Sequence, residues 1–299
     1  MGHHHHHIND LSSPNTEKRL WIALALNLGI TIAQFIGGIV SNSLALISDA
    51  VHNLSDTSSL GVSLFAQKVS GKKPDKQKSF GYKRAEIIGA FGNLVVLVIV
   101  ALFLIKEGIA RLLAPEGIDG VMMFWVALIG LAGNLFSVIL LHADSRKSLN
   151  IKSSYIHLLW DAIASVAVLL GGLLIWAYGL YIVDPILTIA IALYILFNSY
   201  QLLKETVNIL MEAVPDHLDI DEIETALESL NSVLDVHHMH IWNLNEHQLL
   251  LECHVRIDKK DAPEMEQIKE DIKIFLASQY RITHSTIEFE FKPCEEPHH

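Results

Sequence analysis

Long apolar stretches constrain this chain more than any other feature of its sequence. Four of them have about the 20 residues that an α-helix needs to cross a bilayer: residues 20–40, 87–105, 121–141 and 186–203. A fifth, residues 153–183, is apolar after Asp161 and polar before it. Because 51% of the residues are hydrophobic and only 18% are charged, a soluble globular fold is disfavoured and a polytopic helical membrane protein is expected.

A further helix is expected over residues 41–67, although this segment is polar for a membrane span. It holds Asp49, His52 and Asp56, and its apolar residues recur at helical spacing. A structureless loop of that length would be unusual. We therefore predict six transmembrane helices within residues 18–211, with the polar second helix facing the protein interior.

Basic residues gather in two of the connections between the expected helices. Seven Lys and Arg lie between residues 68 and 84 and three between residues 146 and 152, whereas the connections near Asn42 and Gly179 hold none. By the positive-inside rule the basic loops face the cytoplasm, and an even number of spans places both termini there. The first apolar stretch is too long for a cleavable signal, and a bacterial inner (plasma) membrane is expected.

The last third of the chain has a different composition. From Glu212 onward it holds 20 Asp and Glu against 7 Lys and Arg, a net charge of −13. A nucleic-acid partner is excluded because such binders need basic charge, whereas small cations fit. Residues 1–17 are assigned to a purification tag (His3 to His7) with an N-terminal tail, and residues 293–299 to a C-terminal tail.

Residues 212–292 are predicted to form a small α+β domain. Helical patterns at residues 220–230 and from Pro263 to Tyr280 alternate with strand patterns, in the order αββαβ. The predicted strands are residues 233–242, 248–257 and 282–291, the last at a sheet edge. The pattern is that of a split-βαβ, ferredoxin-like fold. Because about 80 residues make a small core, pairing with a second copy is expected.

Two identical spacings carry the chemistry of the apolar region. His52 and Asp56 are four residues apart, and His157 and Asp161 repeat that spacing in another membrane segment. On a helix, residues four apart share a face. Two imidazoles and two carboxylates can surround Zn²⁺ tetrahedrally, and the mixed N/O set favours Zn²⁺ over Mg²⁺, Ca²⁺ or Mn²⁺.

A lone membrane histidine usually only bonds a neighbouring helix. However, each charged group at bilayer depth costs at least ~2.5–3.5 kcal/mol, so two carboxylates indicate a function. Imidazole titrates near pH ~6.5, so protons can compete with the metal for these residues. We therefore expect metal–proton exchange.

A second histidine group lies in the tail domain. His237, His238 and His240 occur in V-H-H-M-H-I-W, His254 on the next predicted strand and His284 at the start of the last. Regular strand alternation would put His238 and His240 on one face and His237 on the other. Surface histidines also cluster by chance, but neighbouring glutamates favour metal binding.

The chain resembles the cation diffusion facilitators, specifically their zinc-type branch, over nearly its whole length. Residues 41–56 (S-N-S-L-A-L-I-S-D-A-V-H-N-L-S-D) resemble the family's second-helix signature, and residues 148–161 (S-L-N-I-K-S-S-Y-I-H-L-L-W-D) its fifth-helix signature. Residues 79–86 (S-F-G-Y-K-R-A-E) resemble the entry to the third helix, and residues 236–242 the cytoplasmic domain.

This resemblance implies a homodimer with six membrane helices per subunit and a cytoplasmic metallochaperone-like domain. It implies Zn²⁺/H⁺ antiport out of the cytoplasm by alternating access, with Cd²⁺, Co²⁺, Fe²⁺ and Mn²⁺ as further candidate substrates. The resemblance assigns two sets of metal ligands: His52, Asp56, His157 and Asp161 in the membrane, and His237, His254, His284 and Glu290 in the cytoplasmic domain. It also suggests Arg84 and Glu212 as a charge interlock near the dimer interface.

Two departures from the family pattern limit what is expected. The loop before the third helix has Asp75, but Lys78 and Tyr82 stand at the family's histidine positions, so no metal is expected there. Only His142 lies near the connection between the fourth and fifth helices, so no histidine-rich collecting loop is expected.

Two alternatives stay open at this point. A metal-dependent intramembrane enzyme would keep one zinc position open for water, which four paired ligands do not leave. A membrane-anchored metal sensor would not explain carboxylates within two membrane helices.

Overall fold

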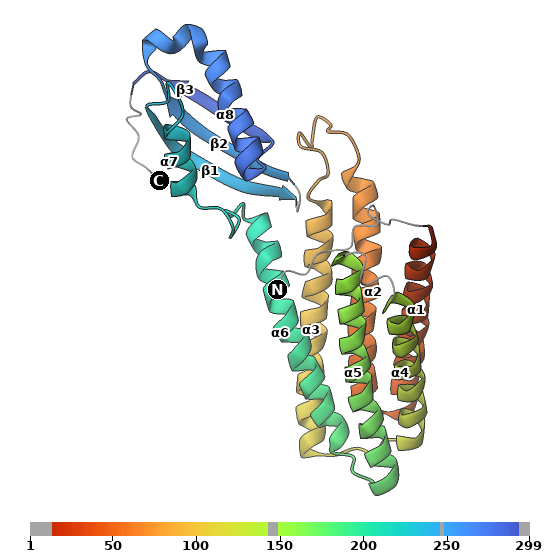
Figure 1. The fold of residues 1–299 in the computed structure, drawn as a ribbon. Helices are drawn as coiled ribbons and strands as arrows, with labels where there is room; N and C mark the ends of the chain where they lie inside the picture. The colour runs from red at the N-terminus through yellow and green to blue at the C-terminus, as the bar shows by residue number, and fades with distance from the viewer. Residues whose placement is uncertain (1–13, 143–148, 246–247, 293–299) are drawn as a thin grey trace. The chain divides into compact units, whose positions relative to one another are not determined.

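The computed structural model describes residues 14–142, 149–245 and 248–292. It divides into two compact units, one of residues 1–65 and 92–203 and the other of residues 66–91 and 204–299. The long helices dominate the first unit, and a small sheet with two helices dominates the second (Figure 1).

Six long helices follow one another, as the sequence predicts: α1 (Pro14–Ser41), α2 (Leu44–Ser70), α3 (Ala85–Leu113), α4 (Gly120–His142), α5 (Leu149–Tyr178) and α6 (Val183–Leu210). Within the described part of the chain, four of them are long and apolar enough to cross a membrane: α3, α6, and the segments Gly120–Ile139 of α4 and Leu159–Tyr178 of α5. Described residues of α1 contribute a shorter apolar segment, Ala25–Ser41. Helix α2 is the polar one.

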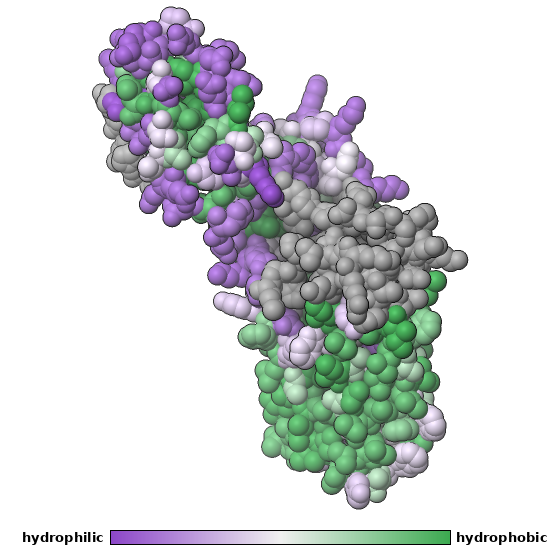
Figure 2. Space-filling view, viewed as in Figure 1, coloured by the Kyte–Doolittle hydropathy of each residue, from purple (hydrophilic) through white to green (hydrophobic). Residues whose placement is uncertain are grey.

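The helical unit exposes apolar rather than polar side chains. Figure 2 shows mainly hydrophobic residues on the part of this unit that is not grey, and large apolar side chains such as Phe103, Ile139 and Phe197 are exposed. A water-soluble protein rarely exposes apolar patches of this extent, so this surface suits contact with lipid.

Small residues let helix α4 pack closely against α1 and α5. A Cβ atom added at Gly37 of α1 would lie 2.6 Å from the Val126 side chain of α4, and one at Gly172 of α5 would lie 2.9 Å from the Phe124 backbone. Such close approach is how membrane helices associate without a hydrophobic drive. It holds α5, the helix that carries Asp161, beside α4.

The tail domain has the predicted αββαβ order, with the elements α7 (Ile220–Glu228), β1 (Asp235–Asn245), β2 (Gln248–Arg256), α8 (Met265–Tyr280) and β3 (His284–Glu290), and a short 3-10 helix η2 (Lys259–Glu264) before α8. Strand β2 is central, antiparallel to β1 and parallel to β3, so β3 lies at an edge as predicted. The α7 and α8 residues Ile223, Leu227 and Ile272 pack with Val255 into one core. His254, the neighbour of Val255, therefore points to the other face of the sheet.

Candidate metal centres

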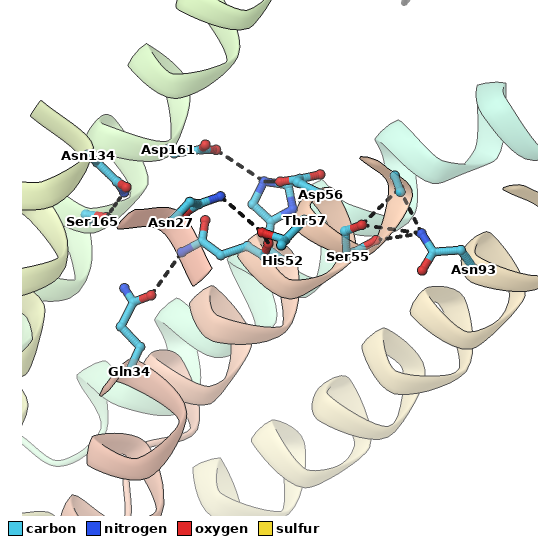
Figure 3. A network of polar contacts seen from close by, with 12 residues as sticks. Asn27, Gln34, His52, Ser55, Asp56, Thr57, Asn93, Asn134, Asp161 and Ser165 are labelled. Carbon is cyan, nitrogen blue, oxygen red and sulfur yellow. Dashed lines mark hydrogen bonds and ion pairs between the residues drawn. The ribbon is translucent and has the colours of Figure 1, made fainter. Parts of the chain in front are cut away.

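Helix α2 brings two of the predicted membrane ligands into one place. His52 and Asp56 stand one turn apart, with 3.8 Å between His52 Nε2 and Asp56 Oδ2. Asp161 of α5 reaches the same imidazole, with Oδ1 3.5 Å from His52 Nε2 (Figure 3). These three side chains form the membrane cluster. Their donor atoms lie within 4.8 Å of one another, which a divalent cation could bridge after a small contraction.

Asp161 is the most enclosed member of the membrane cluster, with 2% of its side chain exposed. Tyr194 of α6 lies edge-on to the His52 ring at 6.1 Å between centroids. The fourth predicted ligand, His157, belongs to α5 one turn before Asp161, but its side chain lies outside the described residues.

Buried amides beside the membrane cluster position α2, a role that the sequence motifs did not indicate. Gln34 of α1 donates a hydrogen bond to Asp49 Oδ2 and accepts one at 2.9 Å from Asn53 Nδ2. All three side chains are buried, and Asp49 and Asn53 flank His52 along α2. On the other side of α2, Asn93 of α3 donates to Ser59 Oγ at 2.9 Å. An amide within the apolar run of α1 was the signal available in the sequence.

A second group of ligands lies on the tail sheet. His237 of β1, His254 of β2 and Glu290 of β3 come from three neighbouring strands and form the sheet cluster, with donor atoms within 4.8 Å. His237 Nε2 lies 3.3 Å from Glu290 Oε2, and His254 Nδ1 lies 2.8 Å from Glu290 Oε1. Both imidazoles thus turn one nitrogen toward the same carboxylate.

The second nitrogen of each imidazole faces a different carboxylate. Asp235 Oδ2 lies 2.9 Å from His237 Nδ1, and Glu288 Oε2 lies 3.7 Å from His254 Nε2. A metal-ligating histidine commonly donates its other N–H to a carboxylate, which fixes the ring and its tautomer. Asp235 is at hydrogen-bond distance and orients His237, whereas Glu288 lies farther from His254, and the N/O donor set of the cluster suits Zn²⁺.

Within one chain, His284 lies apart from the sheet cluster. It pairs with Leu250 at the far end of β2, and its ring contacts Phe80 at 6.2 Å between centroids. Six residues separate it from Glu290 on β3, which corresponds to about 20 Å of strand. A metal-binding role for His284 stays a prediction that this placement does not support.

His238 departs from the strand alternation assumed in the sequence analysis. Between the pairs His237–His254 and His240–Glu252, β1 has one residue more than β2, which makes a β-bulge. The ring of His238 lies 5.3 Å from that of His237 and 5.1 Å from that of His254. His237 and His238 therefore lie on the same side of the sheet, not on opposite faces.

Cys253, the neighbour of His254, does not belong to the sheet cluster. Its side chain packs in the core under α7 and α8. Burial raises the pKa of the Cys253 thiol to about 12, so the protonated form dominates at neutral pH. A buried thiol is a poor metal ligand because the thiolate is the coordinating form.

The loop between α2 and α3 contacts the tail domain within the second unit. Arg84 Nη2 lies 2.7 Å from Glu212 Oε1, so the two residues suggested as an interlock are hydrogen-bonded. Lys83 donates a hydrogen bond to Gln248 of β2. Asp75 accepts hydrogen bonds from the backbone of Lys78 and Gln77, which lower its pKa.

Comparisons with known proteins find one family whose two domains match this chain. The family model "Cation efflux transmembrane domain" matches residues 20–211, and "Cation efflux protein, cytoplasmic domain" matches residues 215–292. The "Metal cation efflux system protein CzcD" of Cupriavidus metallidurans is 39% identical over 99% of this chain and 92% of its own length.

Two further relatives carry more specific names. The "Zinc transporter ZitB" of Escherichia coli (strain K12) is 34% identical over 99% of this chain and 95% of its own length. The "Cadmium, cobalt and zinc/H(+)-K(+) antiporter" of Bacillus subtilis (strain 168) is 35% identical over 97% of this chain and 92% of its own length. All three relatives are named for the movement of metal ions.

Proposed function

Because the chain belongs to the cation efflux family, we propose that it exports Zn²⁺ from the cytoplasm in exchange for protons. Its family consists of transporters, so the intramembrane-enzyme alternative is discarded. The observation that carries the proposal is the membrane cluster, in which Asp56, Asp161 and His52 converge on one point from two helices. His157 is the fourth ligand, one helical turn from Asp161. Zinc and antiporter names among the relatives support this substrate and this coupling.

Proton coupling follows from the chemistry of the ligands. Imidazole and carboxylate must be deprotonated to bind a metal, so an arriving Zn²⁺ displaces protons and a departing Zn²⁺ lets them return. When the cluster opens alternately to the two sides of the membrane, metal and protons move in opposite directions. Cd²⁺ and Co²⁺, both named for a relative, and Fe²⁺ and Mn²⁺ are further candidate substrates.

The membrane arrangement is proposed as follows. Residues 18–211 form the six-helix domain in contact with lipid, and residues 212–292 form the cytoplasmic domain, through which two copies pair as a homodimer. The basic connection between α2 and α3 favours a cytoplasmic location for itself and for both termini. The relatives are bacterial, which supports the inner membrane. Zn²⁺ at the sheet cluster would be structural or regulatory.

Replacement of Asp161 by asparagine tests the proposal. Asp161→Asn keeps the side-chain size but removes a charged ligand, so Zn²⁺ uptake into proteoliposomes should fall by about 100-fold or more, beyond the ~10–100-fold typical of lost supporting residues. Glu107→Gln is the matched control, because this carboxylate on α3 pairs with Arg111 instead. Full transport by a folded Asp161→Asn protein would overturn the proposal.

A further inference from the structure

We propose that His238 is the fourth ligand of a closed metal site formed with His237, His254 and Glu290 within a single chain. The proposal rests on the proposed function only in taking Zn²⁺ as the resident ion. It assigns His238 the ligand position that the family resemblance implied for His284. Three observations carry it: the spacing of the rings, the β-bulge and the backbone conformation of His238.

The three imidazole rings have the spacing of ligands around one ion. With Zn–N bonds of about 2.0–2.1 Å and tetrahedral angles, rings on one Zn²⁺ have centroids about 5 Å apart. The centroids of His237 and His238 are 5.3 Å apart, those of His238 and His254 5.1 Å, and those of His237 and His254 5.5 Å. Three imidazoles and the Glu290 carboxylate make an N₃O set, which fills a tetrahedral zinc site.

The β-bulge is what places His238 on the ligand face. Val236, Met239 and Ile241 all face the core. The core-facing residues of β1 therefore have even numbers before the bulge and odd numbers after it. Without the extra residue, His238 would point into the core with Val236. Bulges occur next to functional sites, where they redirect a side chain.

The backbone of His238 adopts a conformation that few residues accept. Its φ angle is +48°, in the left-handed region. Such residues typically cost of order 1–3 kcal/mol and persist at sites where the strain serves a function. Histidine also tolerates this region better than most residues, together with Asn and Asp. A strained position that carries an imidazole beside two candidate ligands points to metal binding.

Metal binding must move the imidazole of His238 a short way. His237, His254 and Glu290 form the group whose donor atoms lie within 4.8 Å, and His238 is outside that group. A turn of its ring about the side-chain torsions brings a nitrogen toward the others. The Nε2 atom of His238 is already shielded from solvent, so this turn takes place within the protein.

Metal titration of the full-length protein tests the proposal. The background protein carries Asp56→Asn and Asp161→Asn, which silence the membrane cluster, and alanines at His3 to His7. It should bind one Co²⁺ per chain with the intense visible absorption of tetrahedral Co²⁺. Adding His238→Asn, which suits the left-handed backbone, should weaken Zn²⁺ affinity by about 10–100-fold or more and change the Co²⁺ absorption, because water replaces one imidazole among the ligands.

The controls separate a ligand from a merely structural residue. His240→Asn and His284→Asn should keep both affinity and spectrum, and His238→Gly, which also fits the backbone, should behave like His238→Asn. The proposal is overturned if His238→Asn binds Co²⁺ with the background spectrum and affinity, or if the background binds no metal. Zn²⁺ transport by the unmutated chain is measured separately, and its absence would contradict the proposed function alone.

Discussion

The membrane cluster and the sheet cluster use the same ligand types on opposite kinds of scaffold. In the membrane, His52 and Asp56 share one helix face and Asp161 joins from a second helix, within an apolar bundle. On the sheet, three strands supply His237, His254 and Glu290, and the further carboxylate of Asp235 hydrogen-bonds His237. The membrane cluster joins side chains of two separate helices, whereas a hydrogen-bonded sheet holds the other cluster in register.

That difference suggests different roles for the two clusters. A transport site must bind and release its ion, so ligands divided between two helices suit it. A site with oriented histidines on a rigid sheet suits retention. With this division of roles, replacing a ligand of one cluster leaves the function of the other cluster intact.

The largest difference between the effects on the two clusters is expected for His237→Ala. Because it removes a central donor, Zn²⁺ affinity of the sheet cluster should fall by about 100-fold or more, while saturated Zn²⁺ transport should keep most of its rate. Metal binding by the variant in a membrane-silenced background and proteoliposome uptake by the variant with an intact membrane cluster give the two readouts. Loss of both together would show that the clusters do not work independently.

An intermediate effect is expected for Gln34→Leu, which tests the support of the membrane cluster. The change leaves the buried Asp49 and Asn53 each without a hydrogen bond that Gln34 provides, at about 1–3 kcal/mol per group. The thermal unfolding midpoint in detergent should fall, and the KM for Zn²⁺ should rise. Thr31→Val is the control, since its hydroxyl donates within α1 to the Asn27 carbonyl. Equal effects of the two changes would contradict the supporting role.

The smallest effect is expected at the Arg84–Glu212 pair. Both side chains are partly exposed, so a double-mutant cycle with Arg84→Ala and Glu212→Ala should give a coupling energy of about 0–1 kcal/mol in monomer stability. If the pair acts as an interlock at a dimer interface, the loss should appear instead in the fraction of dimer by mass photometry. No change in dimer fraction would count against the interlock.

The sequence predicted the fold well because its signals are local. Apolar length defines α3 to α6, and the helical spacing of the apolar residues of α2 identified it as a helix although its composition is polar. The αββαβ order followed from periodicity in the same way.

What the sequence could not provide depends on register and on contacts between distant segments. The bulge at His238 adds one residue to β1, and no local sequence pattern indicated it. Regular alternation therefore wrongly predicted His237 and His238 on opposite faces of the sheet. The contact between Glu290 and His254 depends on the parallel pairing of β2 and β3, which the sequence does not specify. The same pairing puts His284 at the far end of the strand from Glu290. The support that Gln34 gives to Asp49 joins two helices across 15 residues of sequence.

The central claim is that one membrane cluster exchanges Zn²⁺ for protons, and simultaneous recording of both fluxes tests it most directly. Proteoliposomes containing the protein are loaded with a zinc dye and a pH dye, and an inside-acid pH gradient is imposed. The account predicts that the gradient accelerates Zn²⁺ uptake, that protons leave as Zn²⁺ enters, and that Asp161→Asn stops both. Zn²⁺ uptake that ignores the pH gradient and moves no protons would contradict it.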